Sequence, residues 1–221
     1  MQQQCTELVF VLDKSGSMRG LEKDTIGGFN SVLKKQKKID GQVFVSTVLF
    51  DDSYDLLYDR VPIQDVDFMT SDDYYVGGTT SLLDAVGITI NRIKNIQKNL
   101  KDHEVRKVLF VIMTDGEENS SREFTLSQIK ASIQEQKKKQ DWEFIFLGAN
   151  IDAIATARDF GIAESRAQNY HADSEGVTAC YHALGDAVTS FSCHASLEDD
   201  WKNVIEDDFR RIRLPKCLAT R

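Results

Sequence analysis

The stretch VFVLDKSGSM, from Val9 to Met18, decides the fold class predicted for this chain. Its first half is a run of apolar residues, which is typical of a strand that is buried on both faces. The run ends at Asp13, and the hydroxyl residues Ser15 and Ser17 follow at every second position. In open α/β sheets, ligands bind beyond the carboxyl ends of the strands. The stretch therefore predicts a buried strand of an α/β sheet with a polar site at its end.

The rest of the chain alternates between strand-like and helix-like segments. Strands are predicted at 7–12, 42–50, 56–61, 105–113 and 143–147, and a short edge strand around 169–171. Apolar residues at helical spacing predict helices at 21–39, 82–100, 126–133, 151–160 and 177–191. The link between the second and third strands is too short for a parallel crossover, so these two should form an antiparallel hairpin. The fold class predicted is α/β, a doubly wound and mostly parallel sheet with helices on both faces.

The composition fits one globular domain with a substantial core. The chain has 221 residues, of which 41% are hydrophobic, and a formal net charge of -8. This acidic balance argues against binding to nucleic acid or to an anionic membrane, because both need a positive surface. Residues 1–195 are interpreted as the domain and 196–221 as a C-terminal extension. Trp201, Ile205 and Phe209 follow one another at i, i+4 and i+8, which predicts a helix that docks on the domain or on a partner.

Cysteine use and the N-terminal sequence favour a cytoplasmic protein. The four cysteines are scattered, without a C-x-x-C pair, and are interpreted as free thiols: Cys5, Cys180, Cys193 and Cys217. The start MQQQCTELVF has no basic region and no long apolar stretch, so no signal peptide is expected. No apolar run approaches the ~20 residues of a membrane-spanning helix.

Three loops at the carboxyl edge of the predicted sheet offer oxygen ligands. The first carries Asp13, Ser15 and Ser17, and MTDGEENSS carries Asp115 after the strand at 105–113. The loop YYVGGTTSLLDAV lies between these two in the chain, as the second of the three; it precedes a helix and offers the adjacent residues Thr79 and Thr80. None of these loops supplies histidine or cysteine, and hard oxygen donors suit Mg²⁺, Mn²⁺ or Ca²⁺. The sequence therefore predicts a divalent metal site.

The motifs DKSGSM, GGTTS and MTDGE, in this order, resemble the metal-ion-dependent adhesion site (MIDAS) of von Willebrand factor A (VWA) domains. The resemblance covers roughly residues 5–195. It implies a Rossmann-like α/β fold with one antiparallel edge strand, which agrees with the hairpin. It also implies a complete metal site, in which Asp13, Ser15 and Ser17 form the first motif. Thr80 matches the single threonine of the second motif, with Thr79 as the competing choice, and Asp115 matches the aspartate of the third.

The chain is similar to the stand-alone intracellular VWA proteins of bacteria and phages, including the tellurium-resistance-associated type. The stretch FIFLGANIDAIATARDFGI adds to this resemblance. Those relatives imply a protein-binding module without enzymatic activity, in which the bound cation captures an Asp or Glu side chain of a partner protein. The family does not indicate which protein the partner is, and the oligomeric state stays open.

Two other functions compete with this interpretation. A phosphatase or phosphotransfer enzyme of the haloacid-dehalogenase kind also places an aspartate after its first strand and binds Mg²⁺. Such an enzyme normally needs a second aspartate two residues later as a general acid, and this position is Ser15. The remaining alternative is a structural subunit of a larger complex, in which the metal site is incidental.

Overall fold

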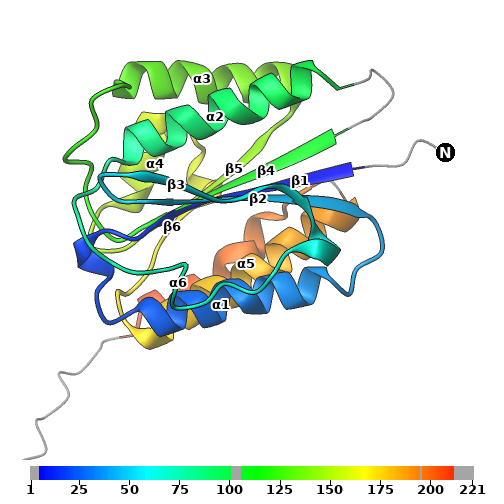
Figure 1. The fold of residues 1–221 in the computed structure, drawn as a ribbon. Coiled ribbons are helices and arrows are strands. Elements are labelled where there is room, and N and C mark those ends of the chain that lie inside the picture. The colour runs from blue at the N-terminus through cyan, green and yellow to red at the C-terminus, as the bar shows by residue number, and fades with distance from the viewer. Residues whose placement is uncertain (1–4, 101–105, 195, 212–221) are drawn as a thin grey trace, which may run out of the picture.

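The computed structural model describes residues 5–100, 106–194 and 196–211. Its centre is a six-stranded sheet in the order β3-β2-β1-β4-β5-β6 (Figure 1). The strands are β1 (Cys5–Asp13), β2 (Gln42–Phe50), β3 (Tyr54–Pro62), β4 (Arg106–Thr114), β5 (Glu143–Gly148) and β6 (Ala167–Asn169). The pair β2–β3 is antiparallel and the other strand pairs are parallel. The predicted fold class and the predicted hairpin are confirmed.

Helices cover both faces of the sheet (Figure 1). One face carries α1 (Glu22–Gln36), α5 (Ser174–His194) and α6 (Asn203–Phe209), and the other carries α2 (Leu82–Lys98), α3 (Leu126–Gln140) and α4 (Ala153–Phe160). Alternate residues of β1 enter two separate cores: Phe10 packs in the core under α1 and α5, and Val11 packs in the core under α2 and α3. Burial on both faces explains why β1 has an uninterrupted apolar sequence.

The strand order reverses between β1 and β4, and this places the polar loops together. These two parallel strands run side by side in register, with Leu12 opposite Met113. Both strands therefore end at the same edge of the sheet, where Asp13 closes β1 and Asp115 directly follows β4. Crevices of this kind, beyond the carboxyl ends of strands at a reversal of strand order, are where α/β sheets bind ligands.

The two edge strands of the sheet are irregular or short. The register of β3 against β2 shifts on both sides of Thr47, and Arg60 has a φ of 53°. The Arg60 guanidinium lies over the Phe44 ring, with Cζ 4.1 Å from the ring centre. Its Nε donates to Glu7 Oε1 at 2.7 Å. The opposite edge, β6, lies at Ala167–Asn169, two residues before its predicted position. A three-residue strand has too weak a pattern to fix its ends from sequence.

The segment after residue 195 packs on the domain. Leu197, Trp201 and Ile205 join the core formed with α1 and α5, while Phe209 is 40% exposed. The Trp201 indole Nε1 donates to the carbonyl of Ser165 at 2.9 Å. The predicted division of the chain at residue 195 stays a prediction.

The described ranges contain neither a disulfide nor a helix that could span a membrane. Within these ranges no disulfide involves Cys5, Cys180 or Cys193, and Cys217 lies outside them. No helix within the same ranges combines the length and the apolar character that a bilayer crossing requires.

Candidate metal centre

Hydrogen bonds join the first and third of the predicted loops. Ser17, in the 3₁₀ helix at Gly16–Met18, donates its hydroxyl hydrogen to Asp115 Oδ1 at 2.5 Å. Ser15 Oγ lies 3.0 Å from Ser17 Oγ. Because the single hydroxyl hydrogen of Ser17 is used on Asp115, Ser15 must be the donor in this second contact. The hydroxyls therefore form a directed chain from Ser15 through Ser17 to the carboxylate.

The second loop brings Thr80, rather than Thr79, to this cluster. Thr80 is buried and Thr79 is exposed. A methyl group at Gly116 would lie 3.3 Å from both Ser17 Oγ and Thr80 Oγ1, so the three loops meet closely around this glycine. Asn119 holds the threonine loop in place, since its Oδ1 accepts from the Thr80 amide at 2.9 Å. The five predicted site residues are thus gathered at one edge of the sheet.

Asp13 is buried and held through both of its carboxylate oxygens. Its Oδ1 accepts from the Ser15 amide at 2.7 Å, and its Oδ2 accepts from the Thr114 hydroxyl at 2.5 Å. The buried Tyr74 hydroxyl donates to the Asp13 carbonyl at 2.6 Å. Thr114 was not among the site residues predicted from the sequence. Its signal was available, because Thr114 directly precedes Asp115 on a strand that should lie beside β1.

A buried lysine next to Asp13 ties the first loop to the β2–β3 turn. The Lys14 amine lies 2.8 Å from Asp51 Oδ2 and 3.1 Å from Asp55 Oδ2. It also lies 4.5 Å from the centre of the Tyr75 ring. Burial lowers the pKa of Lys14, but the hydrogen bonds and charges of the two aspartates outweigh burial and leave the pKa raised. No sequence pattern identified this residue, because a lysine in a loop is usually solvated.

The loops also depend on one glycine with a left-handed backbone. Gly78 has a φ of +65°, and a side chain there would begin 2.2 Å from Asp52 Oδ1. Its carbonyl accepts from the Gly16 amide at 3.2 Å, which joins the threonine loop to the first loop. Only glycine combines this backbone conformation with this close approach.

Burial raises the pKa of both carboxylates of the site. Burial raises the pKa of Asp13, against the effect of hydrogen bonds from Ser15 and Thr114. Burial raises the pKa of Asp115 to about 6; the charge of Asp13 adds to this, while the hydrogen bond from Ser17 opposes it. Asp115 Oδ2 is buried, and among the described residues it has no hydrogen-bond partner. Unpaired buried oxygens of this kind are rare and call for an explanation.

The donor set fits a hard divalent cation. Across the part of the chain that the structure describes, no group of three or more histidine, cysteine, aspartate or glutamate side chains is arranged to hold a metal ion. The predicted set does not depend on such a group, since it combines two carboxylates with three hydroxyls. Hydroxyl and carboxylate oxygens are ligands for Mg²⁺, Mn²⁺ or Ca²⁺, and a cation here would compensate the unpaired oxygen of Asp115.

Comparison by sequence finds no match: no protein-family model and no curated protein corresponds to the chain. Comparison by structure finds several matches. Proximal thread matrix protein 1 from the mussel byssus, solved with a zinc-occupied MIDAS motif, superposes with a TM-score of 0.58 at 12% identity. The match covers 84% of this chain and 46% of the mussel protein.

Two further solved structures extend this likeness. A von Willebrand factor type A protein from Catenulispora acidiphila matches with a TM-score of 0.55 and 13% identity, over 84% of this chain and 42% of that one. Manganese-loaded TRAP protein from Plasmodium vivax matches with a TM-score of 0.54 and 17% identity, over 80% of this chain and 72% of that one. This chain has the VWA fold.

The likeness to VWA proteins is one of fold alone, because the identities are low. The chain also spans less than half the length of the mussel and Catenulispora proteins that it matches. In the VWA fold of this chain, the three motifs named from the sequence lie on the loops that meet beyond β1 and β4.

Proposed function

We propose that this VWA-fold protein is a metal-dependent protein-binding module. A divalent cation would be held by Asp13, Ser15, Ser17, Thr80 and Asp115. The observation that carries the proposal is the buried Oδ2 of Asp115, which has no hydrogen-bond partner in the described ranges and lies near hydroxyls from two other loops. Mg²⁺ is the ion that we propose first, with Mn²⁺ and Ca²⁺ as the alternatives that an all-oxygen donor set also admits.

The partner would bind through an Asp or Glu side chain. When bound, the cation supplies a positive centre for a carboxylate ligand. The protein residues contribute orientation: Thr114 and the Ser15 amide fix the Asp13 carboxylate, and Ser17 fixes that of Asp115. The zinc and manganese forms of the mussel and Plasmodium proteins support the view that this fold accommodates divalent cations.

We further propose that the protein is not an enzyme and that it belongs to the bacterial, cytoplasmic type of VWA protein. Ser15 occupies the position where a haloacid-dehalogenase-like phosphatase would have its general acid. The Ser15 hydroxyl is instead engaged with Ser17 at 3.0 Å. A serine hydroxyl is a poor proton donor to a leaving group compared with a carboxylic acid.

The decisive experiment is thermal unfolding of metal-stripped protein, with and without millimolar Mg²⁺, Mn²⁺ or Ca²⁺. A ligand that binds only the folded state stabilises it by ~2.7 kcal/mol when the free ligand concentration is a hundred times Kd. The wild type should gain stability with Mg²⁺, and Asp13→Ala should not.

The adjacent threonines provide a matched control for this experiment. Thr80→Val removes a buried hydroxyl at constant shape and should lose most of the gain with Mg²⁺. Thr79→Val makes the same change at an exposed position and should keep the gain. An equal gain in all variants, or no gain in the wild type, would exclude the proposed metal site.

A further inference from the structure

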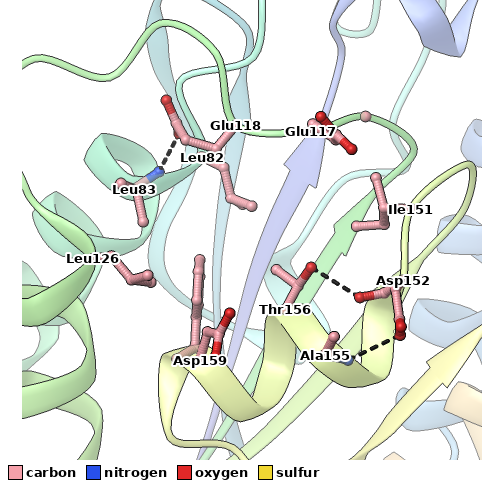
Figure 2. A pocket seen from close by; sticks show the side chains of 12 residues that line it. Leu82, Leu83, Glu117, Glu118, Leu126, Ile151, Asp152, Ala155, Thr156 and Asp159 are labelled. Carbon is pink, nitrogen blue, oxygen red and sulfur yellow. Dashed lines mark hydrogen bonds between the residues drawn. The ribbon is translucent and has the colours of Figure 1, made fainter.

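A pocket of about 440 Å³ lies between α2, α3, α4 and the loop that follows Asp115; its lining residues are drawn in Figure 2. It begins at Gly116, the residue around which Ser17 and Thr80 meet, and it extends between the start of α2, the start of α3, and α4. Apolar side chains form much of its wall, among them Leu82, Leu126, Ile151 and Phe160. The pocket therefore lies beside the candidate metal centre.

The charged residues that line this pocket are acidic. They are Glu117, Glu118, Asp152 and Asp159, and none of the described lining residues is basic. An apolar wall whose charged residues are all negative is complementary to a side chain with a long aliphatic stem and a cationic end. Lysine and arginine are the two side chains with this character.

Two of the four carboxylates already have structural roles. Glu118 Oε2 accepts from the Leu83 amide at 2.9 Å, and Asp152 Oδ1 accepts from the Ala155 amide at 2.9 Å, so each caps the start of a helix (Figure 2). Glu117 and Asp159 are exposed and make no hydrogen bond or ion pair with another described residue. These two carboxylates are the ones available to a ligand.

We infer that this pocket binds a lysine or arginine side chain of the same partner segment that offers its Asp or Glu to the metal. The inference rests on the proposed function, and it adds a second recognition element to it. A segment recognised in this way carries an acidic residue and, at a fixed distance along the chain, a basic residue. The aliphatic stem would contact Leu82, Leu126 and Phe160, and the cationic end would pair with Asp159. Glu117 lies at the other end of the pocket, next to Gly116 (Figure 2).

The experiment is selection from a displayed library of random peptides with one fixed central aspartate, on the full chain in Mg²⁺. Selected peptides should carry lysine or arginine at one preferred distance from the aspartate. One such peptide is then measured with and without a Lys→Ala or Arg→Ala change, on wild type and on E117Q/D159N. The basic residue should strengthen binding to the wild type roughly fivefold more than it strengthens binding to the variant, because the variant keeps the contacts of the aliphatic stem and loses the ionic attraction.

The matched control is D40N/D65N, which neutralises two exposed aspartates outside the pocket, before β2 and after β3. It should bind the selected peptide as the wild type does. Selected peptides without a basic preference, or an equal gain from the basic residue on E117Q/D159N, would overturn the inference and leave the metal site intact. Peptide binding that persists in excess EDTA would overturn the proposed function itself, and the inference with it.

Discussion

Among the individual side chains, Asp115 should make the metal-free protein sensitive to pH. Burial raises its pKa to about 6 from a usual value of 3.8. Between about pH 4 and pH 6 the Asp115 carboxyl is therefore protonated in the folded protein and ionised in the unfolded chain. The free energy of unfolding should fall as the pH rises through this window, by about 2 kcal/mol. Urea unfolding in EDTA at a series of pH values measures this slope.

Asp115→Asn is the variant that isolates this effect. It cannot ionise, so in EDTA at pH 7.5 its free energy of unfolding should exceed that of the wild type by about 1–2 kcal/mol. The same variant should lose the stabilisation by Mg²⁺. A destabilised Asp115→Asn in EDTA at pH 7.5 would contradict this account of the carboxylate.

Lys14 should be essential for stability although it lies in a loop. Lys14→Met leaves Asp51 with its carboxylate largely buried and without its cation. Removal of one partner from a buried ion pair typically costs about 3 kcal/mol. Urea unfolding should show this loss at neutral pH.

Lys35→Met is the matched control for Lys14→Met. Lys35 pairs with Asp186 on the surface, where both side chains are substantially exposed. The change at Lys35 should cost less than about 1 kcal/mol, because exposed ion pairs contribute little. Equal losses for the two variants would contradict the role given to Lys14.

Among the helices, α6 should contribute to the stability of the domain. Trp201, just before α6, is 8% exposed and bonded to Ser165, whereas Val204 within α6 is 48% exposed. Trp201→Ala should lower the free energy of unfolding by about 3 kcal/mol, since it leaves a cavity. Val204→Ala should change it by less than about 0.5 kcal/mol. Similar small effects of both changes in urea unfolding would mean that this segment is not part of the folding unit.

The central strands could be predicted from sequence because burial on both faces leaves them uniformly apolar, as in β1 and β4. The end strand β6 could not be placed to the residue. Asn169, expected to start this strand, ends it, and its Oδ1 accepts from the Ala153 amide at the start of α4 at 2.8 Å. A side chain that caps a distant helix gives no local signal.

Some residues of the candidate site could likewise be predicted from the sequence, and others could not. Asp13, Ser15, Ser17 and Asp115 were predictable because parallel strands bring their carboxyl ends to one edge of the sheet. The choice of Thr80 over Thr79 depends on the backbone of the Gly78 turn, which the pattern of residues does not specify. The contacts of Lys14 with Asp51 and Asp55 depend on the path of the hairpin, so they too appear only in three dimensions.

Across the domain, resistance to opening should fall from the centre of the sheet to its ends. β1 and β4 each pair with strands on both sides and contribute to both cores. Their amides should exchange with solvent only through global unfolding, and those of β6 should exchange faster. Hydrogen exchange followed by mass spectrometry tests this order.

The same measurement locates the effect of metal. Addition of Mg²⁺ should slow exchange in the three loops at 14–18, 77–80 and 115–119, and should leave α6 almost unchanged. Protection that appears at α6 and not in the loops would place the cation elsewhere.

The two outer strands of the sheet have a consequence for the behaviour of the protein at high concentration. A long, regular outer strand exposes backbone groups that can recruit a strand from a neighbouring chain. In β3 the shifted register and the left-handed Arg60 interrupt that row of groups, and β6 is only three residues long. Neither border of the sheet offers a regular template, so a sheet whose central strands are largely apolar is protected against growth into aggregates.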